Sequence, residues 1–352
     1  MKILFLYHPY CNEGMTRAFC AVSEPVFCAR VTMPTEPKNL RRMTLSEFFS
    51  LRRRIRAHEF DLIIAYGCWE GLWRSTHSFS HNLVHVVKKL LFFFPDFGLR
   101  LLLPTIKASG TRLVIYDYDD LTIIPTIRWP YLDVCHLYFK VHPAVNLHKS
   151  FLFQTKRDGE LWNVLRNPRY QAWAKKIRPI SFGADFQDYH IDCIASEKKY
   201  DVFFAGNFHY SQVRREGLMV LEKLREEGMR ICLPTERIPH REFLRLCSES
   251  WLVLSPEGAE WQSARHYESL LMKSVPLINY PNVRLHRPLI NGVHAIYYPP
   301  EDGLLADVIR QALEDKPRLQ KIAEEGREYV LRHHLHDELV KHIIRQAMDD
   351  GG

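Results

Sequence analysis

The sequence predicts an α/β protein of two doubly wound domains, each built around a parallel sheet. Short β-rich apolar runs alternate with amphipathic stretches along the chain, a pattern typical of parallel α/β sheets. The alternation is interrupted by a polar stretch at residues 190–199, which we interpret as a linker, and then starts again. The length of 352 residues also suits two domains of ordinary size better than one core.

The first half of the chain contains the elements expected of one such domain, which we place at residues 1–189. Residues 44–58 predict an amphipathic helix because apolar side chains recur at helical spacing. Residues 162–176 predict two helical pieces because Pro168 interrupts them. Strands are predicted at residues 2–7, 26–31, 61–66, 112–116, 137–141 and 151–154.

The second half repeats the plan without repeating the sequence, and we place the second domain at residues 190–334. Strands are predicted at residues 202–205, 230–233, 251–254, 275–278 and 295–298. Helices are predicted at residues 213–227 and 241–248, after Ser263, and at 304–314, 318–331 and 337–348.

The stretch from residue 251 to residue 279 is the most informative part of the chain. Its strand, polar loop, helix and strand describe one right-handed crossover unit, whose loop lies at the sheet edge where ligands bind. If Ser263 caps the helix, Arg265 and Glu268 lie side by side at i, i+3. Glu268 then either accepts two ribose hydroxyls or forms a surface ion pair with Arg265, worth a few tenths of a kcal/mol.

A second turn suited to a ligand follows the predicted strand at residues 202–205. Gly206 and Asn207 end this strand, and the next helix carries Arg214 and Arg215 near its start. Glycine lets a backbone approach a phosphate, and a helix N-terminus with arginines favours an anion. The alternative is an ordinary turn followed by a solvated helix face.

Three segments of the second half resemble a known family. SPEG at residues 255–258, RHYE at 265–268 and VPLI at 275–278 are similar to the donor-site block of GT-B glycosyltransferases, most closely exostosin-like and CgeB-like members with a glycosyl transferases group 1 type C-terminal domain. The resemblance covers roughly residues 201–344. It implies two Rossmann-like domains facing across a cleft, with a terminal helix in residues 335–352 that crosses back to the first domain.

The resemblance also implies an activity in polysaccharide biosynthesis. A sugar would pass from a nucleotide-diphosphate sugar, UDP- or GDP-linked, to a glycan, lipid-linked or protein acceptor, without a bound metal or other cofactor. Two other functions stay open. One is a nucleotide-sugar epimerase or hydrolase on the same fold, and the other is a non-catalytic binding protein that kept the fold.

Roles for individual residues of the second domain follow from the resemblance. Glu268 would hold the nucleotide ribose, and Arg265 the neighbouring phosphate or ribose. The family's usual helix-ending glycine is replaced by Lys273, and since a non-glycine residue in a left-handed cap costs about 1 kcal/mol, we expect this helix to end differently. The diphosphate would contact Gly206, Asn207 and Arg214, and the transferred sugar would lie near Glu257, Gly258 and Glu260, of which Glu260 is a catalytic candidate.

Candidates in the first domain follow its predicted strands. An inverting transfer needs a general base near the acceptor hydroxyl, and His8 and His142 follow strands where a base could lie. Asp117, Asp119 and Asp120 stand at the end of the strand at residues 112–116, either as acceptor contacts and helix caps or, less favoured, as a DxD-type metal site. We take His8 and Asp117 as catalytic candidates and Gly14, Asp119 and His142 as acceptor contacts. A histidine metal site at His77, His81 and His85 is a further alternative.

Charge and composition limit the partners. Residues 1–185 hold 26 Lys and Arg against 15 Asp and Glu, whereas the remainder is mildly acidic. A basic half suits an anionic membrane or an acidic glycan, and no nucleic-acid recognition motif accompanies it. Residues 69–103 interleave aromatic and aliphatic residues with cations, which fits a buried insertion, a membrane-surface dock for a lipid-linked acceptor or an oligomer contact.

The cellular location is predicted from cysteines and hydropathy. The eight cysteines show neither a CxxC pair nor zinc-ligand spacing, which indicates reduced thiols. No stretch reaches the roughly 18 uncharged residues of a membrane-spanning helix. We therefore expect a cytoplasmic protein, either free or peripheral at the inner membrane face.

Overall fold

The computed structural model describes residues 1–7, 12–27, 41–42, 44–66, 94–152, 165–208, 211–300 and 303–349. The chain divides into two compact units: unit 1 is Met1–Pro179 with Val340–Gly352, and unit 2 is Ile180–Leu339. The boundary therefore lies before the polar stretch at residues 190–199, which belongs to unit 2. Phe182, for example, is already bonded within unit 2, because its backbone N–H donates to Gln262 Oε1 at 3.0 Å.

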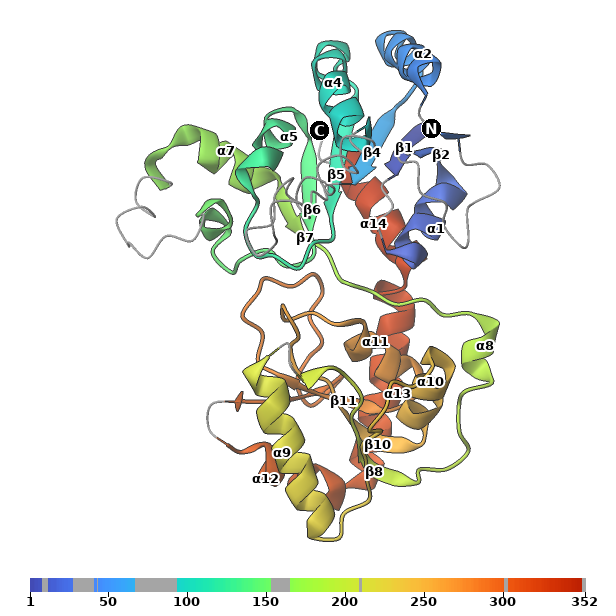
Figure 1. Ribbon diagram of the computed structural model, residues 1–352, viewed down its shortest axis with the longest axis vertical. Helices are drawn as coiled ribbons and strands as arrows, with labels where there is room; N and C mark the ends of the chain where they lie inside the picture. Colours follow the sequence, from blue (N-terminus) through green and yellow to red (C-terminus); the bar gives the residue numbers. More distant parts are fainter. Residues whose placement is uncertain are drawn as a thin grey trace, which may run out of the picture. The chain divides into compact units, whose positions relative to one another are not determined.

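Unit 1 is a doubly wound α/β domain around a parallel sheet, in which the described strands lie in the order β3-β2-β1-β4-β5-β6-β7 (Figure 1). The central strands β4 and β5 are buried along almost their whole length, as their continuous apolar runs predict. The strands are β1 (Ile3–Tyr7), β2 (Glu24–Phe27), β3 (Arg41–Arg42), β4 (Leu62–Tyr66), β5 (Arg112–Asp117), β6 (Leu137–Lys140) and β7 (Ile177–Pro179).

Helices cover both faces of this sheet. Phe5 of β1 packs on Phe19 of α1, and Phe139 of β6 meets His342 of α14, so α1 and α14 cover one face. Residues of α2, α4, α5 and α7 pack with the alternate strand residues to form the core on the other face. The helices are α1 (Glu13–Val22), α2 (Leu45–Arg56), α4 (Phe94–Ser109), α5 (Trp129–Val134), α7 (Pro168–Lys176) and α14 (His336–Asp349), with the short 3-10 turns η1 (Thr126–Arg128) and η2 (Leu147–Phe151).

The end of α14 is part of unit 1, although this helix begins in unit 2. Within unit 1, Arg112 Nη1 donates to the carbonyl oxygens of Ala347 at 2.9 Å and Met348 at 2.7 Å. These bonds satisfy carbonyl oxygens in the last turn of the helix, which have no hydrogen-bond partner inside it.

Some predicted elements of unit 1 differ from the structure. The strand predicted at residues 151–154 is wrong at Phe151, which ends the 3-10 turn η2 because its ring packs against Tyr170 and Trp173 rather than a strand. The break predicted at Pro168 is confirmed, since α7 begins there. Residues 28–31, most of the segment at 69–103, and His8, His77, His81 and His85 lie outside the described residues.

Unit 2 is also doubly wound, and its described strands form a parallel sheet in the order β12-β11-β10-β8-β9. The order reverses between β8 and β10, because β9 returns to one side of β8 while the later strands add on the other. The predicted fold class, two doubly wound parallel α/β domains, is confirmed. The strands are β8 (Tyr200–Phe203), β9 (Ile231–Cys232), β10 (Ser250–Leu254), β11 (Val275–Asn279) and β12 (Ile296–Tyr298).

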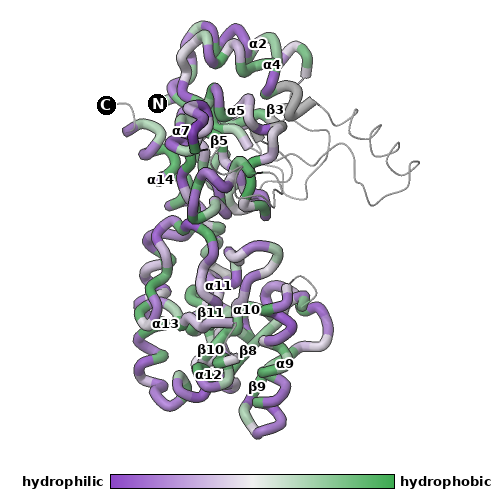
Figure 2. The backbone as a smooth tube through the Cα atoms, turned by 90° about the vertical axis from the view of Figure 1, so that its left-hand side faces the viewer, coloured by the Kyte–Doolittle hydropathy of each residue, from purple (hydrophilic) through white to green (hydrophobic). Residues whose placement is uncertain are grey.

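The sheet of unit 2 lies between two apolar layers, and Figure 2 shows the hydrophobic positions gathered along its strands. Val253 and Ile278 pack with residues of α10, α11 and α13 on one face. Val202 and Leu252 pack with residues of α9 and α12 on the other. The helices are α8 (Asp188–Ile191), α9 (Gln212–Glu226), α10 (His240–Ser248), α11 (Ala264–Leu271), α12 (Leu305–Glu314) and α13 (Lys316–His333).

The end of α11 corrects one expectation. Lys273 adopts the left-handed conformation, with φ 56°, that the family's glycine would take. Its N–H donates to Leu270 O and that of Ser274 donates to Ser269 O, each at 2.9 Å, which is the bonding of a Schellman cap. The prediction that the helix ends differently is therefore wrong, because these two bonds and the Lys198 amine, 2.7 Å from the Lys273 carbonyl oxygen, hold the cap in place.

Candidate functional site

The candidate site lies in unit 2 where the strand order reverses. In open α/β sheets ligands bind outside the carboxyl ends of the two strands at such a point. Here these strands are β8 and β10, which are directly paired. The loop after β8 contains Gly206 and Asn207, and the loop after β10 contains Glu257, Gly258 and Glu260.

Arg265 reaches this point from the first turn of α11. The predicted cap is confirmed, since Ser263 Oγ accepts from the Arg265 N–H. The guanidinium lies against Gly206, where an added Cβ would be 2.6 Å from Arg265 Nη2. It also lies over the rings of Phe204 and Phe243, at 5.6 and 6.0 Å from their centroids. A side chain at position 206 would therefore displace this guanidinium from its present place.

Arg265 is half-buried, and two of its guanidinium atoms are buried without an acceptor. Its Nε and Nη1 atoms have no hydrogen-bond partner in the described chain, and it makes no ion pair there. Burial, and then the positive charge of Arg214, lower the pKa of Arg265 to about 10. A buried donor left without an acceptor costs roughly 1–3 kcal/mol, and more when it is charged.

Arg214 joins the two loops. It lies in the first turn of α9, which Ser211 caps, and it is buried. Its Nε donates to Glu257 O at 2.9 Å and its Nη1 to Asn207 O at 3.1 Å. A Cβ at Gly258 would be 2.6 Å from Arg214 Nη2. Each arginine therefore lies against a glycine in one of the two loops at the switch point, the place where the strand order of the sheet reverses.

The pair of arginines makes this position strongly attractive to an anion. The two guanidinium groups repel each other, since the charge of Arg214 contributes to the lowered pKa of Arg265. A phosphate accepts charge-assisted hydrogen bonds from guanidinium groups, and the N-termini of α9 and α11 add favourable dipoles. The arrangement could hold a phosphate or diphosphate.

The loop after β10 is held by residues that the sequence prediction missed. Ser255 Oγ lies 2.7 Å from His266 Nδ1, and His266 Nε2 lies 3.0 Å from Trp261 O, so the imidazole carries its proton on Nε2 and accepts the Ser255 hydroxyl. Asn279 Oδ1 accepts from the Glu257 N–H at 2.8 Å. A polar Asn279 directly after the apolar run of β11 was an available signal.

Glu257, Gly258 and Glu260 lie in this loop as predicted from the motif. Glu257 Oε2 accepts from Asn279 Nδ2 at 3.0 Å, and the Gly258 N–H donates to Glu260 O at 2.9 Å. These bonds fix the loop between β10 and α11. Contact with a transferred sugar, and the catalytic candidacy of Glu260, stay predictions.

Glu268 does not pair with Arg265, so the interpretation of these two residues as a surface ion pair is wrong. Glu268 Oε1 instead accepts from His240 Nε2 of α10 at 2.8 Å. The two side chains of α11 diverge because Arg265 turns towards Gly206 and Glu268 turns towards α10. A ribose contact of Glu268 stays a prediction.

The structure places Asp117 of unit 1 in a buried ion network. Its Oδ2 lies 2.9 Å from Arg128 Nη1 and 3.0 Å from Lys140 Nζ, and it accepts from Tyr138 OH at 2.6 Å. Burial alone would raise the pKa of Asp117, but the charges of Arg128 and Lys140 outweigh it, and the pKa is lowered. A fully buried carboxylate with two cations is a poor base, so this geometry does not support a catalytic Asp117.

The acceptor candidates of unit 1 lie in different settings. Asp119 accepts from the Arg128 guanidinium. Gly14 is buried in the first turn of α1, which Asn12 caps. His142 is buried, with Nε2 at 3.5 Å from Asp120 Oδ1. None of these positions tests an acceptor contact, and these roles stay predictions.

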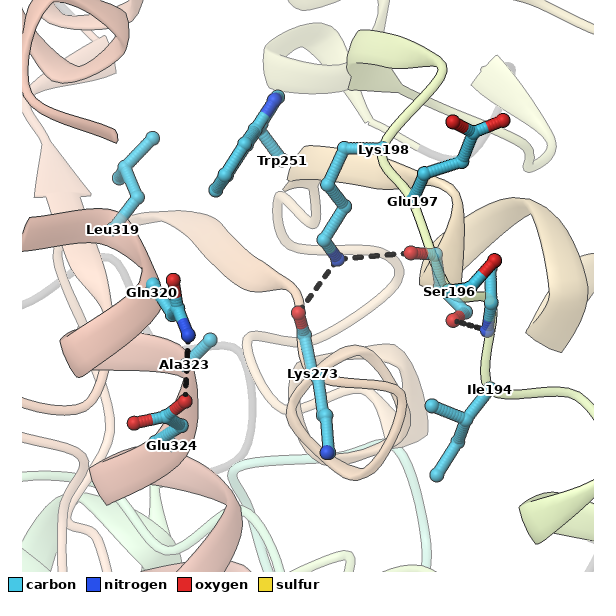
Figure 3. Close-up of a pocket in the computed structure, with 12 residues that line it drawn as sticks. Ile194, Ser196, Glu197, Lys198, Trp251, Lys273, Leu319, Gln320, Ala323 and Glu324 are labelled. Atoms are coloured by element: carbon cyan, nitrogen blue, oxygen red, sulfur yellow. Dashed lines mark hydrogen bonds between the residues drawn. The ribbon is translucent and has the colours of Figure 1, made fainter. Parts of the chain in front are cut away.

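A cavity of about 350 Å³ lies by the starts of β8 and β10, at the sheet edge opposite the arginines (Figure 3). The amine of the half-buried Lys198 beside it lies 2.8 Å from Ser248 O, 2.7 Å from Lys273 O and 2.9 Å from Ser274 Oγ. Burial lowers the pKa of Lys198 to about 8. All three amine hydrogens have acceptors within the chain. Lys198 therefore bonds the carbonyl groups that follow α10 and α11, and it has no hydrogen left for a ligand.

Among the described residues, no three His, Cys, Asp or Glu side chains come together in a way that could hold a metal ion. No helix in the same part of the chain is long and apolar enough to cross a membrane.

Comparison with known proteins identifies the fold. No protein-family model and no curated protein matches the sequence. Among solved structures, HepE of Anabaena in complex with UDP matches with a TM-score of 0.54 at 13% identity, over 99% of this chain and 100% of that one. A glycosyltransferase from Rickettsia africae matches with a TM-score of 0.52 at 10% identity, over 99% and 98%. A trehalose-6-phosphate synthase matches with a TM-score of 0.53 at 10% identity, over 99% of both chains. At such identities the likeness shows the fold alone, which is the GT-B fold.

Proposed function

We propose that this protein is a glycosyltransferase that binds a nucleotide-diphosphate sugar in unit 2 and passes the sugar to an acceptor. The observation that carries the proposal is the pair of arginines at the switch point, where Arg265 has buried N–H groups without acceptors. HepE, which shares the fold, was solved with UDP and with UDP-glucose. That likeness supports a nucleotide sugar as the ligand of the same fold here.

The diphosphate would lie between Arg214 and Arg265, over the backbone of Gly206 and Asn207. Departure of the nucleotide diphosphate places negative charge on its terminal phosphate. Preorganised donors aimed at developing charge are usually the largest catalytic term. Two guanidinium groups and two helix N-termini would supply that stabilisation without a divalent metal.

The remaining parts of the proposal follow the family resemblance. Glu268 would bind the ribose, and Glu257, Gly258 and Glu260 would lie near the sugar. The acceptor, a glycan, a lipid-linked sugar or a protein, would be presented by unit 1. Membership of the exostosin-like or CgeB-like group is part of the same proposal.

Nucleotide binding tests the donor site directly. We expect calorimetric titration with UDP, GDP, CDP and dTDP to find one that binds. Arg265→Met should weaken it about 100-fold, because one charge-assisted hydrogen bond contributes about 1.5–3 kcal/mol. Arg225→Met, an exposed arginine further along α9, is the matched control and should bind as the wild type. Equal affinity of Arg265→Met and wild type would sink the assignment.

Turnover separates transfer from the two alternatives. A transferase should release nucleotide from its donor sugar much faster when an acceptor is added. Fast conversion of the donor with no acceptor would favour an epimerase or hydrolase. Tight binding with no conversion under either condition would favour a non-catalytic protein.

A further inference from the structure

We propose that His240 is a positioning residue that holds Glu268 for the ribose and keeps it from pairing with Arg265. The proposal rests on the proposed function, because it assigns Glu268 and Arg265 to the nucleotide. His240 is the first residue of α10, and its Nε2 lies 2.8 Å from Glu268 Oε1 of α11. The two residues are 28 positions apart in the chain, so no local pattern relates them.

The contact leaves the carboxylate available to a ligand. The Glu268 side chain is 18% exposed, and only its Oε1 is used by His240. Oε2 has no hydrogen bond in the described chain, and it is not one of the side-chain atoms that are buried without a partner. It is therefore accessible to a ligand. A ribose hydroxyl can therefore donate to Oε2 while His240 fixes the rotamer through Oε1.

The contact also determines whether Glu268 pairs with His240 or with Arg265. Glu268 stands three residues after Arg265 on α11, a spacing at which opposite charges on a helix usually pair. Such a pair would neutralise both groups that the nucleotide needs. His240 draws Glu268 towards α10, and Arg265 remains with its N–H groups ready for a phosphate. Removal of His240 should therefore weaken both ribose and phosphate binding, although His240 is assigned contact with neither.

Packing holds the His240 ring at this place. The ring stacks on Phe243, with 12° between the planes, and its edge faces His190 at 6.5 Å between centroids. Phe243 in turn lies under Arg265. One short turn of α10 thus supports both charged residues of the site.

The charged groups around His240 set its titration. The hydrogen bond to Glu268 raises the pKa of His240, burial opposes this, and the charges of Glu268 and Asp185 add to the rise. Asp185 Oδ1 is itself 2.8 Å from His336 Nδ1. His190, the other titratable neighbour, has its pKa lowered, chiefly by burial. The positive charge of His240 therefore strengthens the contact, and this contribution is lost as pH rises through the raised pKa of His240.

The test is a double-mutant cycle on the full chain, read by titration with the nucleotide that the wild type binds. We expect His240→Ala to weaken binding about tenfold, and to have no effect when Glu268 is already Gln. His240→Gln keeps a donor and loses the titration, so it should restore most of the affinity and abolish the His-dependent fall with rising pH. Arg241→Ala, an exposed neighbour on α10, should bind as the wild type.

Several outcomes overturn the proposal. If Glu268→Gln loses affinity while His240→Ala binds as the wild type, His240 has no positioning role and the proposed function stands. If His240→Ala weakens binding equally in the Glu268→Gln background, His240 acts by some other route than Glu268. If no nucleotide binds the wild type, the proposed function fails and this inference fails with it.

Discussion

Each unit carries cations at the carboxyl edge of its sheet, but their contacts differ. There, Arg128 and Lys140 both contact Asp117, and Arg128 also contacts Asp119. In unit 2, Arg265 makes no ion pair in the described chain, and Arg214 bonds carbonyl oxygens beside it. The same kind of residue therefore serves two purposes. Where the chain supplies the anion the cations build structure, whereas Arg265, which has none in the described chain, is the cation that we propose for a ligand.

The difference is also one of stability. A buried ion pair contributes little net free energy, but removal of one partner leaves an uncompensated charge and costs several kcal/mol. An arginine that is already uncompensated has no such partner to lose. Variants of the two groups should therefore differ in size and in sign.

The largest effect is expected from Asp117→Asn. It would leave Arg128 and Lys140 without a shared anion, and the free energy of unfolding should fall by about 3–5 kcal/mol in urea titrations. Because folding lowers the pKa of Asp117, its stabilisation is present above the unfolded-state pKa and is lost as pH falls through the folded-state value. Glu242→Gln, which removes an exposed pair with Arg245, should cost less than about 1 kcal/mol. Equal losses of unfolding free energy for the two variants would show that the network has no special structural role.

An intermediate effect is expected from Lys198→Met. Lys198 is a half-buried cation whose acceptors are supplied by the chain, so it belongs with the structural group. Its loss leaves Ser248 O and Lys273 O without this donor and should lower the free energy of unfolding by about 2 kcal/mol. Lys321→Met, on an exposed face of α13, is the control and should change stability little. A Lys198 variant as stable as this control would show that the bonds to its amine contribute nothing.

The smallest effect, and the only one of opposite sign, is expected from Arg265→Met. Methionine fills the space beside Phe204 and Phe243 without a buried unpaired charge, so the free energy of unfolding should rise by about 1 kcal/mol. Thermal unfolding without ligand measures this. A loss as large as that of Asp117→Asn would instead mean that Arg265 is a structural cation and would break the comparison.

Local sequence was sufficient for many of the elements. The apolar runs of β4, β5, β10 and β11 are strands at nearly the predicted positions, and Ser263 caps α11 as expected. Such features depend on side-chain period and on capping bonds between residues a few positions apart. Where tertiary packing competes with propensity the prediction failed, as at Phe151, whose ring joins an aromatic cluster with Tyr170 and Trp173.

The sequence by itself determined that Gly206 and Gly258 stand after strands and that Arg214 and Arg265 begin helices. Only the tertiary structure decided that β8 lies beside β10, which brings each arginine against a glycine at the point where the strand order reverses. Only the tertiary structure also shows that Glu268 bonds to His240 and that Asp117 contacts two cations. The reason is that strand order and side-chain partners depend on contacts between distant parts of the chain, whereas strands, helices and caps depend on neighbours.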